Sequence, residues 1–480
     1  METLNPPTKS SDDSPAAAVS RPPWMILQRH GIATEYSTVH SDGRTSASSF
    51  TSSGRPFRIS FALSPPPANS TIEYDWAGFP AGQDESSTQP DIIAAHGSCV
   101  LISVMGPHAR NSGLNAVGYF LYEPAGGDRR LPLLRRLPRC YFARLYERYR
   151  ARERRGEDAQ ENSYYYHFEE DEDDSWPPCG QTSTTTNTRF LMKEEAGVLR
   201  RGEDDVVVAQ LDVPPRRNRR AHGAAELCVL RVGRGEWELK RVPIVFFSGD
   251  DTGKEREGMK DWWETDVAVP VGDRFLCFVD YFRGFLLYDA TVAADVDLTL
   301  RYVPLPVEVP DGNPDTDDYG RPKMEHSRNL ADAGDMGGQS TVRFVSIEPR
   351  CCCGQPGRST CDRSRSAFLV TTWTLTLPST GEEPQQPAAV RWVKNSVLDC
   401  DELWAQPRYG SLPRVGLQYP VIVSSDNPDV VCFIVYDFNS SNMDHWMLEV
   451  DTVSKVLRSV VLYTSPDQPY WRVPVKFPCC

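Results

Sequence analysis

The apolar residues of this sequence fall in short runs that prolines and turn residues interrupt. Residues 57–63 are a clear example, because Phe57, Ile59 and Phe61 alternate with polar residues until the prolines that begin at Pro65. Alternation with a period of two is typical of a half-buried strand. With 39 prolines and 33 glycines among 480 residues, strands and turns are favoured over long helices. The sequence therefore predicts a mostly β protein.

A loose two-strand unit recurs along the chain. Its first strand ends near a tyrosine and an acidic residue, and its second strand ends in a Leu-Pro or Val-Pro step. The clearest copies are residues 118–138, 227–243 and 284–304, with further members at 368–377 and 431–463. Such a unit buries its faces only against neighbours like itself. We therefore expect a β-propeller-like repeat of short antiparallel sheets with inserted loops, and two packed β-sandwich domains are the alternative.

The remaining segments set the expected domain limits. Residues 1–23 read as a disordered N-terminal tail, 24–463 as a single β-rich domain, and 464–480 as a C-terminal tail. Insertions are expected near residues 140–187 and 308–340. Within the first insertion, residues 140–155 predict one amphipathic helix, with five apolar side chains on one face, namely Tyr141, Phe142, Leu145, Tyr146 and Tyr149.

Several phrases of the sequence are similar to those of a known family. They lie at residues 197–211, 225–243, 265–284, 342–350 and 392–400, and the most specific is Phe-Leu-Cys-Phe-Val-Asp-Tyr-Phe-Arg-Gly, from Phe275 to Gly284. The chain thus resembles the plant family known as domain of unknown function 1618, which often has Trp where this chain has Phe278. The resemblance implies a plant protein of a diverging set. It implies no established activity, cofactor or catalytic residue.

The charge balance and the cysteine count limit partners and location. Lys and Arg total 52 against 66 Asp and Glu, which gives a net charge of -14. An acidic chain repels nucleic acid and anionic lipid unless it carries a local basic patch. No apolar run reaches the roughly 18 residues of a membrane helix, and the N-terminus lacks a signal-peptide pattern. We expect a soluble cytoplasmic or nuclear protein whose 13 cysteines are mostly reduced.

Two loops approach ligand-binding motifs without matching them. Residues 248–254 follow an apolar strand as a phosphate-binding loop would, but Ser248 replaces the first glycine and Glu255 replaces the metal-binding hydroxyl. Residues 311–315 mimic the start of a calcium loop, yet Thr316 and Pro322 stand where glycine and glutamate are needed. Both segments are interpreted as polar loops, and no cofactor is expected.

The cysteines provide no convincing metal or lipid site. Cys351, Cys352 and Cys353 are adjacent, with Cys361 nearby, whereas structural zinc needs two spaced pairs of ligands. The purified protein is therefore expected to carry no stoichiometric metal. Cys479 and Cys480 end the chain without a complete prenylation motif, so lipidation is not expected.

No catalytic motif is present. A Gly-x-Ser-x-Gly elbow and a His-x-x-x-His pair are both missing. The least implausible nucleophile site is His96-Gly97-Ser98-Cys99, and a turn before the strand at Val100 explains it better. The arginines between Arg129 and Arg155, eleven in all, suggest either a nucleic-acid-binding helix or a solvated helix offset by the acidic residues 169–174.

Three functions stay open on this basis. The first is a non-enzymatic binding or adaptor protein that presents the loops of its scaffold to a protein partner. The second is an enzyme with a dispersed polar site at one end of the ring, including Asp280, Arg283, Glu348 and Arg350. The third is nucleic-acid binding through residues 129–155. The ring hypothesis further predicts that an N-terminal strand, best matched by residues 57–63, completes the last sheet beside residues 431–437 and 456–463.

Overall fold

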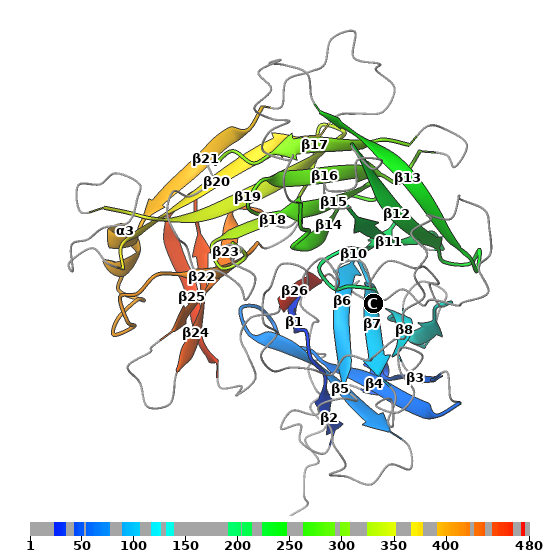
Figure 1. Cartoon of the computed structure of the whole chain (residues 1–480). Helices are drawn as coiled ribbons and strands as arrows, with labels where there is room; N and C mark the ends of the chain where they lie inside the picture. The colour runs from blue at the N-terminus through cyan, green and yellow to red at the C-terminus, as the bar shows by residue number, and fades with distance from the viewer. Residues whose placement is uncertain are drawn as a thin grey trace, which may run out of the picture.

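The computed structural model describes residues 24–34, 43–51, 54–76, 89–105, 117–125, 131–138, 191–202, 204–213, 223–246, 263–292, 298–307, 324–351, 366–377, 391–422, 427–436, 444–463 and 472–475. These residues form a mostly β protein built from antiparallel sheets (Figure 1). The short helices among them are η2 (Gly43–Thr45) and α3 (Cys400–Trp404). No described helix has the length and apolar character needed to cross a membrane.

Five four-stranded meanders follow one another along the chain, and we number them as blades 1 to 5. Blade 1 contains β6 (Pro90–His96), β7 (Cys99–Met105), β8 (Val117–Glu123) and β9 (Leu133–Arg136). Blade 2 contains β10 (Ala196–Arg200), β11 (Val206–Asp212), β12 (Ala224–Arg231) and β13 (Trp237–Phe246). Blade 3 contains β14 (Val267–Val271), β15 (Phe275–Asp280), β16 (Gly284–Asp289) and β17 (Leu300–Pro304).

The later blades continue the pattern. Blade 4 contains β18 (Arg328–Met336), β19 (Gln339–Pro349), β20 (Phe368–Thr376) and β21 (Val393–Asp399). Blade 5 contains β22 (Gln418–Ile422), β23 (Val430–Tyr436), β24 (His445–Asp451) and β25 (Val456–Tyr463). Blade 6 joins both chain ends in the order β26 (Arg472–Val475), β1 (Met25–Gln28), β5 (Asn69–Trp76), β4 (Pro56–Ala62) and β3 (Ala47–Phe50), and β2 (Ile32–Ala33) also pairs with β5.

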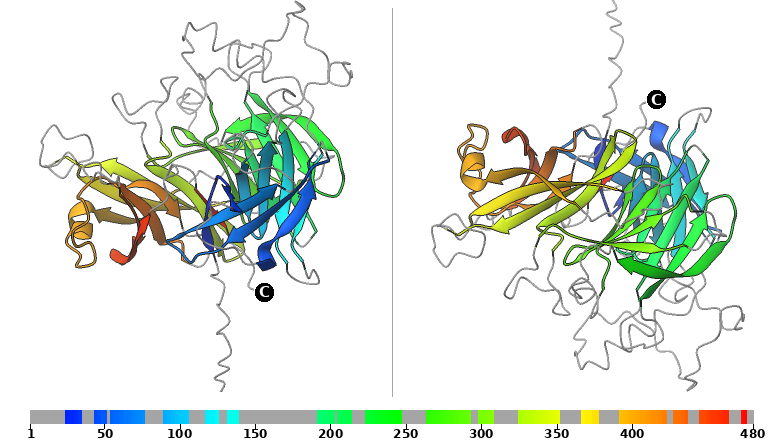
Figure 2. Two further views of the ribbon diagram at one scale, coloured as in Figure 1. Left: turned by 90° about the horizontal axis from the view of Figure 1, so that it is seen from below. Right: turned by 90° about the horizontal axis from the view of Figure 1, so that it is seen from above.

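The blades close into a ring. The first strands of blades 1 to 5 contact one another in order, and β26 closes the circle between β22 and β6. Each neighbouring pair of blades encloses its own hydrophobic cluster. Small side chains on the first strands, such as Ala94, Gly197 and Ala268, permit this close approach around the axis. The arrangement is the expected β-propeller-like repeat. Figure 2 shows the sheets following one another around the ring.

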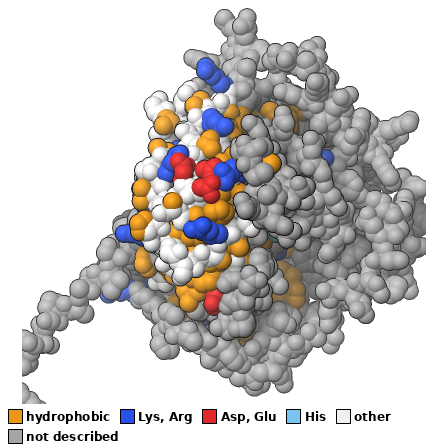
Figure 3. Space-filling model, turned by 90° about the vertical axis from the view of Figure 1, so that its left-hand side faces the viewer, with side chains coloured by type: hydrophobic (Ala, Val, Ile, Leu, Met, Phe, Trp, Pro, Cys, Tyr) orange, Lys and Arg blue, Asp and Glu red, His pale blue; other side chains and the backbone are white. Residues whose placement is uncertain are grey.

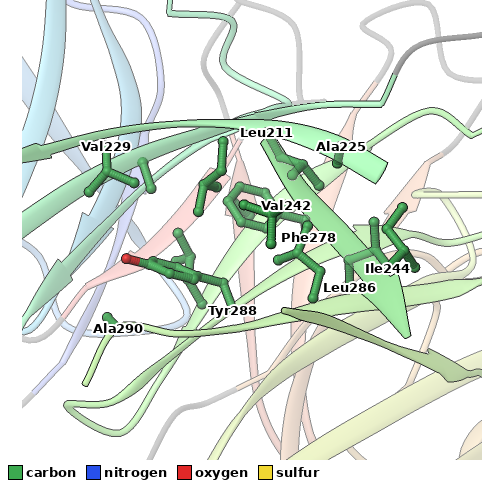
Figure 4. Close-up of a cluster of buried hydrophobic side chains, with 14 of the residues drawn as sticks. Leu211, Ala225, Val229, Val242, Ile244, Phe278, Leu286, Tyr288 and Ala290 are labelled. Carbon is green, nitrogen blue, oxygen red and sulfur yellow. The ribbon is translucent and has the colours of Figure 1, made fainter. Parts of the chain in front are cut away.

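Sandwiching between two neighbours explains why the middle strands are apolar on both faces. In β15, Leu276 and Phe278 face the core shared with blade 2, whereas Cys277 and Val279 face the core shared with blade 4. The cluster between blades 2 and 3 is drawn in Figure 4, where Val242, Phe278, Leu286 and Tyr288 converge from the two sheets. Continuous apolar runs are expected for strands buried on both faces.

The two ends of the chain meet in blade 6. β1 pairs antiparallel with β26, with Met25 opposite Val475, and Figure 1 shows the two strands side by side. Residues 472–475 therefore form a strand where the sequence predicted a C-terminal tail. The prediction for residues 57–63 was wrong in detail, because β4 lies in blade 6 and does not neighbour β23 or β25. β1 and β26 make the closing pair instead.

The predicted insertions and tails fit the structure unevenly. The insertion predicted at 308–340 is too long, because residues 328–340 form β18 and the start of β19. Their alternation of apolar and polar residues is weak, since the strand contains Asp332, Gly334 and Asp335. The predicted helix at 140–155 and the N-terminal tail at 1–23 lie outside the described residues.

Outer strands of neighbouring blades are fastened to each other at the rim. Trp237, which begins β13, donates its Nε1–H to the carbonyl of Pro138 at 2.9 Å. Trp392, which precedes β21, donates to the carbonyl of Pro304 over the same distance. Two of the proline steps of the repeating unit, at Pro138 and Pro304, therefore mark points where one blade accepts a hydrogen bond from the next. Between blades 2 and 3 the contact is a parallel strand pair, with Ile244 opposite Leu300.

Candidate functional site

The first strands of blades 1 to 5 all begin at one end of the ring, and we call this end the start face. Antiparallel connection places the end of every second strand at the same end. The start face therefore collects residues from many parts of the sequence, among them Asp91, Lys193, Asp280, Arg328 and Glu348. The described strands flanking residues 139–190, 247–262 and 308–323 also end and begin there.

Asp280, at the end of β15, is the most deeply buried carboxylate of the start face. Its side chain is 0 % exposed. It accepts hydrogen bonds from the backbone N–H of Phe282 at 2.9 Å and from Arg283 Nη1 at 3.2 Å. The Arg283 side chain also covers the Phe282 ring, with 5.1 Å from Cζ to the ring centroid. Asp280 thus fixes the turn that connects β15 to β16.

Arg328, at the start of β18, joins this turn to blade 4. Its Nη1 donates to the carbonyl of Tyr281 at 2.7 Å. Burial lowers the pKa of Arg328 to about 10, although the nearby carboxylates of Glu348 and Asp280 favour the charged form. Glu348 in turn accepts from Ser346 Oγ at 3.4 Å. Asp280 and Glu348, two members of the dispersed polar site expected from the sequence, thus both act on the buried Arg328 guanidinium, and Arg283 joins them through its bond to Asp280.

Arg350 lies apart from that group. Its guanidinium contacts Asp399 Oδ2 at 2.9 Å and Asp401 Oδ2 at 2.8 Å, at the N-terminus of α3. Asp399, Cys400 and Asp401 place ligand atoms close enough together for a metal ion. The Arg350 cation already pairs with both carboxylates, and Asp399 also caps α3. The arrangement is that of an ion-paired helix cap.

A second charged group lies where blade 6 meets blades 1 and 2. His30 Nδ1 lies 2.6 Å from Asp91 Oδ1, and the backbone N–H of Ile92 donates to the carbonyl of Arg29 at 2.9 Å. Burial lowers the pKa of Arg29, while the carboxylates of Glu194 and Asp91 oppose the shift. Burial likewise lowers the pKa of Lys193, whose Nζ lies 3.6 Å from Glu194 Oε1. Positively and negatively charged side chains therefore lie together at this junction between blades.

A strained tyrosine marks the junction of blades 4 and 5. Tyr419 has a φ of 49°, a left-handed conformation that costs a bulky residue about 1–3 kcal/mol. Its position before Pro420 makes that conformation still less favourable. Two hydrogen bonds to His326 hold it, from Tyr419 N to the carbonyl at 2.9 Å and between the hydroxyl and Nε2 at 2.7 Å.

The candidate nucleophile at residues 96–99 is a structural turn between β6 and β7. Arg200 Nη1 donates to Ser98 Oγ at 2.6 Å and to Cys99 Sγ at 3.3 Å, and His96 Nδ1 accepts from the Arg200 backbone at 2.9 Å. Cys99 is fully buried. These contacts join blade 1 to blade 2 and leave the thiol inaccessible to substrate.

Several other predictions from the sequence fall largely outside the described residues. They concern the loops at 248–254 and 311–322, the cysteines at 352, 353, 361, 479 and 480, and most of the arginine-rich segment 129–155. Within that last segment, Arg135 lies 3.7 Å from Glu123, and Arg136 donates to the carbonyl of Thr51 at 3.4 Å. These two arginines are thus engaged within the fold.

Sequence reasoning did not single out Arg29, Lys193, Glu194 or Tyr419 as functional candidates. Each stands beside a short strand without a motif around it, so no local pattern distinguished it. The one available signal was the Tyr419-Pro420 step, because a residue before proline has restricted backbone freedom. Their assembly depends on the ring.

The fold and its start face define a β-rich, propeller-like protein in which charged groups such as Asp280 and Asp91 are engaged with neighbouring side chains. Residues 278–432 match the model of DUF1618, described as a protein of unknown function. Residues 278–432 therefore carry a DUF1618 domain, as the resemblance to that family suggested. The matched segment runs from β15 in blade 3 to β23 in blade 5, so its limits fall within blades.

The solved structures that match this chain resemble it only weakly. A levansucrase mutant of B. megaterium gives a TM-score of 0.24 with 9% identity and covers 89% of both chains. A Trypanosoma rangeli sialidase mutant displaying trans-sialidase activity gives 0.24 with 9% identity, covering 93% of this chain and 58% of the other. Scores this low carry no argument about function. None of the curated proteins matches this chain.

Proposed function

We propose that this protein is a non-enzymatic binding or adaptor protein that presents the loops of its β-rich ring to a protein partner. The observation that carries the proposal is the engagement of Asp280. This carboxylate would be the centre of a dispersed catalytic site, yet it is fully buried and accepts bonds from its own turn. A general acid or base must instead reach the proton that it transfers.

The neighbouring charges support the same interpretation. Arg328 donates to a backbone carbonyl, and Arg350 lies between two carboxylates of a helix cap. These side chains hold blades and turns in place. The start face then contributes a rigid platform from which long connections depart, which is the usual placement of binding residues on such scaffolds.

The test is capture with the full chain as bait, followed by reconstitution of each candidate complex from purified proteins. At least one partner should bind directly with a Kd of about 1 µM or tighter. Lys193→Glu should weaken that complex, because Lys193 lies on the start face. Lys240→Glu is the matched control, since Lys240 has a similar exposure on β13. Equal binding by both variants would exclude the start face.

Catalytic turnover of a small molecule by the purified chain would contradict the proposal of a non-enzymatic protein. A purified chain that consumes a small molecule, and loses that activity on a start-face substitution such as Glu348→Gln, would establish the enzyme alternative.

A further inference from the structure

The rim of the ring contains strand edges that no described strand pairs. These edges belong to β3, β9, β21 and β25. Unpaired edges invite the addition of another strand, and proteins protect them with short strands, charges and bulges. β3 and β9 have four residues each, and β9 contains Arg135 and Arg136. β21 begins with exposed residues that include Lys394, and its pairing with β20 has a bulge.

The pairing of β25 with β24 also has a bulge, beside Arg458, but residues 459–462 beyond it contain no charged residue. It has eight residues with the sequence Val-Leu-Arg-Ser-Val-Val-Leu-Tyr. The only charged residue, Arg458, is paired with Asp451 at 2.6 Å. Val460 and Val461 are partly exposed, and Leu462 is 48 % exposed. Residues 459–462 therefore present an uncharged edge with apolar side chains.

The first half of the same edge already receives strand-like hydrogen bonds. Gln406, which follows α3, donates its side-chain N–H to the carbonyl of Lys455 at 2.7 Å and accepts from the N–H of Leu457 at 2.6 Å. A primary amide offers the donor and acceptor that a peptide group offers. Arg408 then donates to the carbonyl of Arg458. The outer edge of β25 thus points its backbone groups toward a neighbour.

Blades 2 and 3 show what a completed edge looks like in this fold. There the end of β13 pairs in parallel with the outer strand β17, with Val245 opposite Arg301 and Phe246 opposite Tyr302. Alternate residues of that segment, Ile244 and Phe246, pack on the core between the blades. At blade 5 the same place is occupied by α3 and Gln406, which reach only as far as residue 458.

We propose that residues 459–462 of β25 bind an extended segment of a partner protein, added as an outer strand of blade 5. The segment is uncharged and has apolar residues at alternate positions. Charge selects this chemistry, because residues 459–462 carry no charge and the neighbouring Lys455 is already paired with Glu402 at 2.7 Å. Figure 3 views the side on which α3 and β25 lie in Figure 1, and apolar side chains surround the charged groups there. The proposal rests on the proposed function only in that the partner is a protein.

The experiment screens a displayed random-peptide library against the full chain and measures the affinity of the selected peptides for variants. Leu462→Lys places a protecting lysine on the edge, and peptide affinity should fall about tenfold or more. Val453→Lys is the matched control, because Val453 is 51 % exposed but lies in the turn before β25. Bound peptide should also slow amide exchange at residues 459–462 of the unmodified chain.

Other outcomes separate this surface from the start face. Peptides that lose affinity with Lys193→Glu but keep it with Leu462→Lys would overturn the rim proposal and leave the proposed function standing. A library without binders would overturn the rim proposal, whereas the capture experiment would still test the start face. Self-association that Leu462→Lys abolishes would identify a second copy of the chain as the occupant and overturn the proposed partner.

Discussion

Gly284 is the residue at which a single methyl group should most clearly test the fold of blade 3. A Cβ atom at this position would overlap the carbonyl oxygen of Val303 and lie 2.8 Å from the Tyr302 ring, and real Cβ contacts below 3.0 Å essentially do not occur. The neighbour is the backbone of the paired strand β17, so it cannot rotate away. Gly284→Ala must therefore separate β16 from β17 at this end.

The expected cost follows from these contacts. Overpacking of this kind costs about 1–3 kcal/mol. Separation of the strands also weakens the hydrogen bond from Leu305 N to the Arg283 carbonyl, at 3.2 Å, which is worth about 1 kcal/mol. The smaller entropy of the unfolded alanine chain returns about 0.4–1 kcal/mol. We expect a net loss of about 2 kcal/mol in the free energy of unfolding.

The assay is urea unfolding followed by tryptophan fluorescence. Gly416→Ala is the matched control, because nothing lies within 4 Å of its Cβ position and its φ is not left-handed. That variant should be neutral or slightly stabilised. An insoluble Gly284→Ala chain beside a soluble control would equally support the close approach of β16 and β17. Equal unfolding midpoints for the two variants would refute it.

Four further sets of variants test other parts of the structure. Trp237→Phe and Trp392→Phe should each lower the free energy of unfolding in urea by about 1 kcal/mol, because each removes one hydrogen bond at the rim. The two losses should be nearly additive, because the two hydrogen bonds share no partner. A double variant whose loss differs strongly from the sum would contradict their independence. Burial alone would raise the pKa of Asp289, but hydrogen bonds from Arg274 and Thr291 hold it below the ordinary value of 3.8. The ionised Asp289 carboxylate therefore stabilises the fold above pH 3.8, and this stability is lost as the pH falls through the lower pKa of the folded state. The free energy of unfolding of Asp289→Asn should change less with pH in that range. Parallel plots of unfolding free energy against pH for the variant and the unmodified chain would count against the bond to Arg274. Replacing residues 156–186 with a short Gly/Ser linker should leave the melting temperature unchanged, because Tyr119 holds both flanks through Leu137 N and Leu191 N, each at 2.9 Å; a large drop in the melting temperature would show that the segment contributes to the core. Deleting residues 1–21 should have no effect, whereas ending the chain at Tyr463 removes β26 and should make the protein insoluble or much less stable; a soluble, unaltered truncation would refute closure by β1 and β26.

The local sequence was sufficient to predict the class of fold. Alternating runs such as 57–63, and the repeated strand pair ending in a proline step, predicted short antiparallel sheets packed against their own kind. This succeeded because each of blades 1 to 5 is a meander of neighbouring strands, so its pairing is set by residues close together in sequence. The proline steps at Pro138 and Pro304 proved to be rim acceptors, a role that no pattern indicated.

Tertiary structure decided the closure of the ring and the grouping of its charges. β26 and β1 pair across almost the whole length of the chain, and neither strand has a strong pattern of its own. Arg29, Asp91 and Lys193 likewise come from three different blades, and Asp280 reaches Arg328 only because blades 3 and 4 are adjacent. Periodicity reports which face of a strand is buried, but it contains no information about which distant strand lies beside it. The sequence by itself determined the blades, and the packing of one blade on the next determined where their polar ends meet.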